Sequence, residues 1–224
     1  MSKIVRAVLG IVALYAVYVP TAGAQNKSTM TFGIMAGANY AKVSQDPEQT
    51  DVSFDYTTGL LAGAFLGIRV NDVFSIEPQV LYSVKGTKLE GTGSNSSITG
   101  SIKLNYVEVP LLGKFWIPMS NSQVRPFVFA GPEFAYLISC RAKGTAFGTT
   151  VSDDCDQTDL KVKSTDVGAT VGGGLEFMAG RQSVRVDGRY THGLTDINDD
   201  STDPTKAKNR AFAVTVGVGF PLPK

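Results

Sequence analysis

Residues 74–85 read FSIEPQVLYSVK, and their side chains alternate between two faces along the whole stretch. One face carries mostly polar and charged side chains, among them Glu77, Gln79 and Lys85. The apolar face consists of Phe74, Ile76, Pro78, Val80, Tyr82 and Val84. A period of two residues is typical of a β-strand that buries one face in an apolar phase. This stretch therefore predicts a strand.

The same alternation recurs along the chain, most clearly at residues 58–70 and 211–220. No segment keeps a helical period, so we predict an all-β fold. Each expected strand is long enough to cross a bilayer as a tilted strand, which takes about 9–11 residues. The eight predicted strands are residues 30–40, 57–70, 74–86, 102–117, 125–139, 165–178, 183–194 and 210–220.

The connections between these strands alternate strictly between long and short. The long ones are residues 41–56, 87–101, 140–164 and 195–209, and the short ones are 71–73, 118–124 and 179–182. Outer-membrane barrels have short periplasmic turns and long external loops, whereas a soluble sandwich has no reason to place every long loop at one end. The pattern predicts an eight-stranded antiparallel transmembrane β-barrel. An even number of strands places both of its ends in the periplasm.

Composition narrows the choice of function. The 224-residue chain is 43% hydrophobic and 18% charged, with a net charge of +1, one His and two Cys. A nucleic-acid-binding protein would need a basic surplus, and a zinc site would need more Cys or His ligands. We therefore expect no nucleic-acid partner, no metal, no cofactor and no enzymatic activity.

The N-terminal segment indicates export. Lys3 and Arg6 precede an apolar run at residues 7–19, and Ala22-Gly23-Ala24 follows it as a small-residue cleavage site. Thirteen apolar residues extend only about 20 Å as a helix, too short to span a bilayer. We expect a signal peptide at residues 1–24, cleaved between Ala24 and Gln25, and a barrel domain at residues 25–224.

Three stretches resemble the PorT-like outer-membrane β-barrel family. They read LNYVEVPLLGKF at residues 104–115, RPFVFAGPEFAYL at 125–137 and RYTHGLTDI at 189–197. The resemblance implies a small porin-family barrel in the outer membrane of a Gram-negative bacterium, and it says little about function. The chain departs from the usual barrel ending, because Pro-Leu-Pro-Lys follows Phe220.

Projecting the strands inward gathers twelve charged side chains in the lumen. They are Arg69, Glu77, Lys85, Glu108, Lys114, Arg125, Glu133, Asp166, Glu176, Arg185, Asp187 and Arg189. Arg or Lys at mid-depth on the lipid face would cost about 2–4 kcal/mol, which favours the inward placement. Glu108, Lys114, Arg125 and Glu133 are expected to pair across two adjacent strands. We interpret the set as a salt-bridge plug, with a gated ion or proton pathway as the alternative.

Three smaller features fall in or near the external loops. Cys140 and Cys155 are expected to form a disulfide, because the exported location is oxidising. Residues 196–203, DINDDSTD, partly resemble a calcium loop but lack its Gly and its bidentate Glu, so a solvated acidic loop is the first interpretation. His192 beside Tyr190 suggests a lipid-modifying hydrolase as an alternative to an ordinary interfacial residue.

The sequence thus predicts an outer-membrane barrel with a filled polar lumen and a structural, interaction or adhesion role through its external loops. The alternatives are a passive porin for small solutes and an outer-membrane lipid-modifying enzyme. The expected partners are outer-membrane lipid, the barrel-assembly and periplasmic chaperone machinery, and a surface ligand or protein that contacts the long loops at residues 41–56, 87–101, 140–164 and 195–209.

Overall fold

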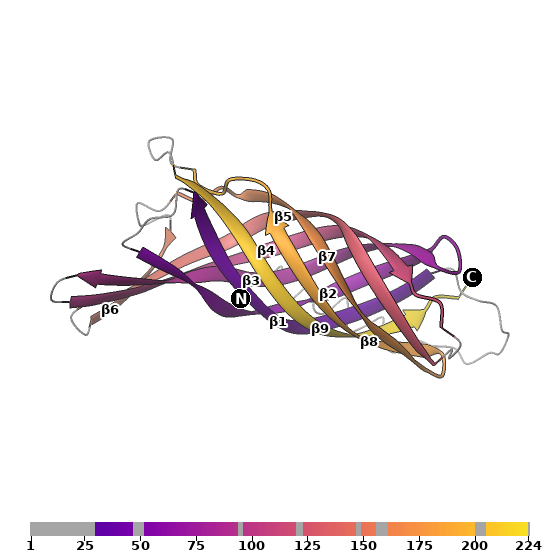
Figure 1. Cartoon of the computed structure of the whole chain (residues 1–224). Coiled ribbons are helices and arrows are strands. Elements are labelled where there is room, and N and C mark those ends of the chain that lie inside the picture. Colours follow the sequence, from indigo (N-terminus) through magenta and orange to yellow (C-terminus); the bar gives the residue numbers. More distant parts are fainter. Residues whose placement is uncertain are drawn as a thin grey trace.

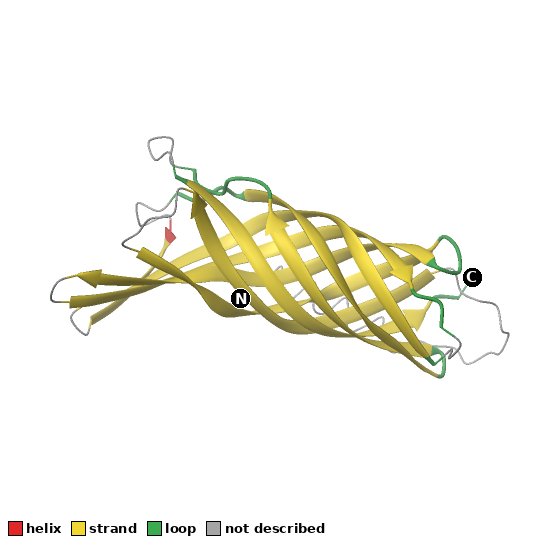
Figure 2. Ribbon diagram, viewed as in Figure 1, coloured by secondary structure: helices red, strands yellow, loops and turns green. Residues whose placement is uncertain are grey.

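The computed structural model describes residues 30–46, 52–93, 96–119, 123–146, 149–155, 161–199 and 205–223. The expected signal peptide and its cleavage site between Ala24 and Gln25 lie outside them. Strands make up nearly all of the described chain (Figure 2). They are β1 (Met30–Asp46), β2 (Val52–Arg69), β3 (Phe74–Gly93), β4 (Ser96–Trp116), β5 (Val124–Ala146), β6 (Thr149–Asp154), β7 (Thr165–Ala179), β8 (Gln182–Gly193) and β9 (Lys206–Pro221). Within these ranges no helix is long and apolar enough to cross a membrane.

Eight of these strands close into an antiparallel barrel, as the alternation predicts. Neighbours pair in the order β1, β2, β3, β4, β5, β7, β8, β9, and β9 pairs back with β1 from Thr31–Pro221 to Asp46–Lys206. Figure 1 shows the closed, tilted arrangement. Closure leaves no strand edge open to lipid, where an unpaired N–H or C=O would find no hydrogen-bond partner. The last strand extends one residue past Phe220, which faces Phe32 across the β1–β9 pair.

The two faces of each strand have opposite character. On β9, Phe212, Val214 and Val216 are 50%, 58% and 52% exposed, whereas Thr215 between the last two is fully buried. Apolar side chains on the outside and polar ones within reverse the usual order of a water-soluble protein. The outer face is therefore the lipid-contacting surface of a membrane barrel.

Aromatic side chains form two bands around this outer face. Within β1, β3 and β9 an outward aromatic residue at one end is followed eight residues later by another. The pairs are Phe32 and Tyr40, Phe74 and Tyr82, and Phe212 and Phe220. Eight residues extend about 26 Å along a strand, or about 20 Å in height at a tilt of about 40°. That height is close to the apolar band of outer-membrane barrels, which aromatic girdles flank on both sides.

The four long connections are shorter than the sequence predicted, because strands occupy part of each expected loop. Only residues 94–95 separate β3 from β4, where a loop at 87–101 was expected. β1 and β9 likewise reach into the expected loops 41–56 and 195–209, and β6 lies within the expected loop 140–164. Beyond the apolar band the sequence is rich in Ser, Thr and Gly and loses the apolar alternation, yet strand pairing continues. The eight-strand prediction was therefore wrong about strand bounds and missed β6.

The prolonged strands project beyond the barrel at the end opposite the short turns (Figure 1). We call this part the external extension. It comprises residues 52–56 of β2, 86–93 of β3, 96–105 of β4, 139–146 of β5 and all of β6. Among the described strands, β6 pairs with β5 alone. A hydrogen-bonded sheet holds its side chains in a defined pattern, which a loop would not do.

The predicted disulfide between Cys140 and Cys155 is present, with the two Cα atoms 5.4 Å apart. It joins the external part of β5 to the residue that follows β6. Cys155 is buried, and Cys140 packs against a cluster that includes Leu104 and Tyr106. The bond therefore ties the β5–β6 hairpin to the top of the barrel.

Removing this bond should loosen the hairpin and leave the barrel folded. In the chain-entropy model a closed loop of about 15 residues contributes about 3 kcal/mol, and that constraint acts on the hairpin alone. We expect Cys140→Ala/Cys155→Ala to be cleaved within residues 140–155 under limited proteolysis, detected by mass spectrometry. Unreduced wild-type protein is the control. Identical cleavage patterns would show that strand pairing suffices to hold the hairpin.

Candidate functional site

The barrel interior carries the charged side chains that the sequence placed there. Arg69 and Arg125 are partly exposed near the end with the short turns. The other ten are buried. These are Glu77, Lys85, Glu108, Lys114, Glu133, Asp166, Glu176, Arg185, Asp187 and Arg189. Because buried charges require partners, the contacts of this set decide what the lumen does.

Lys85 on β3 holds two carboxylates in the outer half of the lumen. Its Nζ lies 2.8 Å from Glu108 Oε1 and 3.2 Å from Glu133 Oε1. The hydroxyls of Thr170 and Thr191 donate to the other oxygen of Glu133, at 2.7 and 3.3 Å. The expected pairing of Glu108 and Glu133 with Lys114 and Arg125 is therefore wrong. Lys114 and Arg125 lie nearer the short-turn end of the barrel, where their carboxylate partners are Glu77 and Glu176.

Two arginines from β8 occupy the centre of the lumen. Arg185 Nη1 donates to Glu77 Oε1 at 2.7 Å, and Arg189 Nη2 donates to Asp187 Oδ1 at 2.9 Å. Arg189 Nη1 also donates to Gln79 at 2.9 Å. Charge-assisted hydrogen bonds of this kind are roughly twice as strong as neutral ones.

Each of these arginines also lies over a phenyl ring. The Cζ atom of Arg185 is 3.6 Å from the ring centroid of Phe65, and that of Arg189 is 5.3 Å from the centroid of Phe129. The rings in turn cover Gly33 and Gly172 on the neighbouring strands, where a Cβ atom would collide with them. Glycine is thus required at these two positions because the aromatic rings that support the arginines fill the space.

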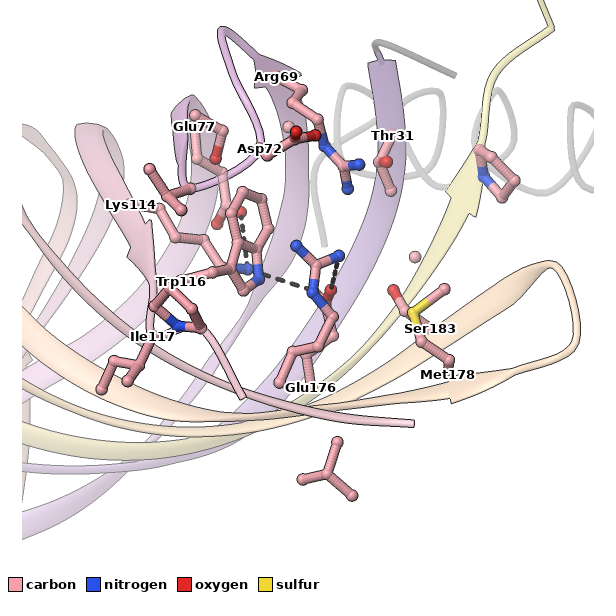
Figure 3. Close-up of a pocket in the computed structure, with 18 of the residues that line it drawn as sticks. Thr31, Arg69, Asp72, Glu77, Lys114, Trp116, Ile117, Glu176, Met178 and Ser183 are labelled. Atoms are coloured by element: carbon pink, nitrogen blue, oxygen red, sulfur yellow. Dashed lines mark hydrogen bonds and ion pairs between the residues drawn. The ribbon is translucent and has the colours of Figure 1, made fainter. Parts of the chain in front are cut away.

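A pocket of about 570 Å³ opens at the short-turn end of the barrel (Figure 3). Lys114 lies on its inner wall, 3.5 Å from Glu77 and 3.3 Å from Glu176. Arg125 contacts Glu176 at 3.9 Å. Two guanidinium groups lie near the ring of Trp116, with Arg125 at 4.6 Å and Arg69 at 5.3 Å from its centroid. Four basic side chains and three carboxylates line the pocket, so their charges nearly balance and favour neither an anionic nor a cationic ligand.

The external end of the lumen is closed by the segment between β8 and β9. Ile197 is 3% exposed and packs with Val43, Leu104 and Tyr106. Below it, Asp166 accepts hydrogen bonds from Asn209 at 2.8 Å and from Thr195 at 2.6 Å. The described part of this segment is thus a folded plug.

Asp196 fastens the plug to β9. Its Oδ1 accepts the backbone N–H of Asn198 at 3.0 Å and that of Ala207 at 2.8 Å. Burial raises the pKa of this carboxyl, but the two backbone hydrogen bonds and the charges of Lys163 and Lys206 together hold the pKa below its usual range. The contact is therefore present at neutral pH and is lost as the pH falls through that lowered pKa.

The calcium hypothesis for residues 196–203 gains no support from this geometry. Asp200 and Asp203 lie outside the described residues, and the described ones contain no cluster of three or more His, Cys, Asp or Glu that could hold a metal. Since Asp196 is already engaged by backbone N–H groups, its described role is to hold the plug.

His192 lies on the outer face of β8, in the external aromatic band. Its Nδ1 is 3.2 Å from the hydroxyl of Tyr190, whose ring packs on Phe212 at a centroid distance of 4.6 Å. Across the β8–β9 pair it faces Arg210. Within the described residues the side chain of His192 hydrogen-bonds to Tyr190, another residue of the external aromatic band, which is the setting of an interfacial residue.

Sequence reasoning missed several neutral members of the network. Asn209 donates to Asp166 and to the hydroxyl of Tyr106, and Asn39 donates to Ser83 at 2.9 Å. Asn209 fell in the expected loop 195–209, although continuing the alternation backward from Ala211 would have placed it inside. No pattern in the sequence identifies the hydrogen-bond partners of Asn39, because these partners depend on which strands meet across the lumen.

Comparison with known proteins agrees with this architecture. A family model described as outer membrane protein beta-barrel domain matches residues 23–199. No curated protein matches the chain in sequence. Among solved structures, the outer membrane protein OprG from Pseudomonas aeruginosa has a TM-score of 0.52 at 14% identity, with 89% of this chain and 100% of that one covered.

Two further solved structures have lower TM-scores. Neisserial surface protein A gives 0.48 at 18% identity, covering 85% of this chain and 97% of its own. The attachment invasion locus protein Ail of Yersinia pestis, crystallised with the heparin analogue sucrose octasulfate, gives 0.41 at 18% identity, covering 85% and 99%. At these identities the likeness concerns the fold alone.

Proposed function

The chain belongs to the outer membrane protein β-barrel domain family, and on that premise we propose that it is a non-conducting barrel that presents a rigid sheet with a small basic excess on its outward face outside the cell. The observation that carries the proposal is the external extension, a hydrogen-bonded sheet stapled by the Cys140–Cys155 disulfide. A sheet of this kind displays its side chains with little loss of conformational entropy on binding.

The outward face of the extension carries a small excess of basic residues. It carries Lys88 on β3, Lys103 on β4, and Arg141 and Lys143 on β5, all exposed. Lys103 stands directly opposite Arg141 in the β4–β5 register. Asp154 pairs with Arg141 at 3.6 Å, and Asp55 faces Lys88 in the β2–β3 register. Glu90 lies two residues beyond Lys88 on β3 and therefore shares its face by strand alternation. The four basic residues exceed the three carboxylates of this face by one, and this small excess favours an acidic macromolecule outside the membrane.

Binding of a soluble polyanion tests this proposal. We expect immobilised heparin, used as the probe, to retain wild-type barrel in detergent at low ionic strength and to release it as salt rises. Lys88→Gln/Lys103→Gln/Lys143→Gln should elute at clearly lower salt, because three of the four exposed basic groups are removed. Lys161→Gln, an exposed lysine outside the extension, serves as a control for loss of one charge. Equal elution of the triple variant and wild type would contradict the role of this face.

The side chains that fill the lumen support the proposal that the barrel does not conduct ions or solutes. Arg185, Arg189 and Lys85 with their carboxylates occupy the centre, and Ile197 lies in the plug above them. In planar bilayers we expect no steady single-channel conductance from wild-type protein. A stable ohmic pore would instead favour passive transport of small solutes.

A further inference from the structure

A second basic group lies on the outward face of β1 and β9, just beyond the external aromatic band. Lys42 follows Tyr40 by two residues on β1, and Arg210 precedes Phe212 by two on β9. Lys208 continues the same face of β9. Two residues correspond to about 7 Å of strand, so these cations lie next to lipid-facing rings, at the level where the polar headgroups of the outer leaflet begin.

The register places like charges directly opposite each other in this group. Lys42 is the cross-strand partner of Arg210, an arrangement that destabilises a sheet in the absence of a counter-charge. Arg210 Nε is buried, and no described atom accepts a hydrogen bond from it. The Nζ atom of Lys42 lies 5.1 Å from the ring centroid of Tyr56. An anion bound between Lys42 and Arg210 would offset their repulsion and accept the free Nε–H.

Asp196, the described carboxylate nearby, serves other groups. Asp196 accepts the backbone N–H of Asn198 and Ala207, and its charge interacts with Lys206, the basic residue at the start of β9. Asp46 is the register partner of Lys206. Lys42, Lys208 and Arg210 therefore remain as the net positive part of this face, with His192 beside Arg210.

We propose that Lys42, Lys208 and Arg210 form a binding site for the phosphate groups of an outer-leaflet glycolipid. The position on the strands favours a lipid over a soluble anion. In the external extension Lys88 lies six residues beyond Tyr82 and Arg141 lies five beyond Tyr136, well away from the membrane surface. The β1–β9 group instead adjoins Tyr40 and Phe212, which are both 50% exposed and face the acyl chains. The acyl chains of one lipid would thus contact the aromatic band, and its phosphates would contact the basic group directly beyond that band.

Native mass spectrometry of the detergent-solubilised barrel, titrated with purified lipid A, tests this site. We expect Lys42→Gln/Lys208→Gln/Arg210→Gln to bind lipid A at least about tenfold more weakly than wild type, since all three basic groups that face the lipid phosphates are removed. Arg210→Lys alone keeps the charge and should retain most binding. Circular dichroism and heat-modifiable migration establish that each variant is folded.

The charge-matched control is Lys88→Gln/Lys103→Gln/Lys143→Gln, which we expect to bind lipid A like wild type although it loses heparin. Equal weakening in both triple variants would show that only net charge matters and would overturn the site. Wild-type protein provides a test that needs no variant: lipid A stripped of phosphate should bind about tenfold more weakly, and unchanged binding would also overturn the proposal. If inorganic phosphate or heparin competes as well as lipid A does, the ligand is a soluble anion and the assignment to lipid is wrong.

Discussion

Replacing Lys85 with Met should lower the free energy of unfolding by about 3–5 kcal/mol, the usual cost of removing one partner from a buried charge network. Glu108 and Glu133 would then face each other with no cation between them. Water cannot compensate readily, because the cavity beside Lys85 measures only about 10 Å³, room for at most about one molecule. Urea unfolding of the refolded barrel, followed by tryptophan fluorescence or gel migration, measures the loss.

Two further variants make this result specific to the network. Glu108→Gln should cost much less, because Lys85 keeps Glu133 as its partner at 3.2 Å. Lys85→Met/Glu108→Gln/Glu133→Gln, which removes all three charges, should recover much of the stability lost in Lys85→Met. Equal losses for Lys85→Met and Glu108→Gln, or no recovery in the triple variant, would argue against a shared ion cluster.

Placing a charge on the outer face at mid-height should also be costly. Val216 on β9 lies four residues from Phe212 and four from Phe220, at the middle of the apolar band, and it is 52% exposed. We expect Val216→Arg to lower the free energy of unfolding in lipid vesicles by about 2–4 kcal/mol, since the guanidinium would face hydrocarbon at the bilayer midplane. Reversible urea unfolding in vesicles of defined composition gives the value.

Val151 provides the matched control for this substitution. It is 57% exposed, also lies on a strand, and belongs to β6 of the external extension, outside the apolar band. Val151→Arg should therefore leave the unfolding transition unchanged within about 0.5 kcal/mol, as surface substitutions usually do. If both variants lost the same stability, the outer face of the barrel would not be a lipid-facing surface at this height.

The sequence alone determined the class of fold and the faces of its strands. The period of two along residues 74–85, 58–70 and 211–220 assigns each side chain to the inside or the outside, because a strand has only two faces. The order of long and short connections gives the orientation. From these two patterns the inward charges could be named without coordinates, and the exported location predicted the Cys140–Cys155 disulfide.

Strand bounds outside the membrane were less predictable. The alternation reports an apolar environment on one side, and that environment ends at the aromatic bands. The residues of the external extension keep their cross-strand hydrogen bonds without this signal, so β6 and the outer parts of β3 and β4 were expected to be loops. Composition there is typical of turns, and only the pairing with a neighbour makes these residues strands.

Partners across the lumen and groups across the outer face were decided by the tertiary structure. The period of two residues predicts that Lys85, Glu108 and Glu133 point inward. Barrel closure and strand register determine that they meet, since they bring these residues of β3, β4 and β5 to one height. The same holds for Lys42 and Arg210, which are far apart in sequence and face each other because β9 closes on β1. Local physics assigns a side chain to a face, whereas the chemistry of a site depends on which distant strands become neighbours.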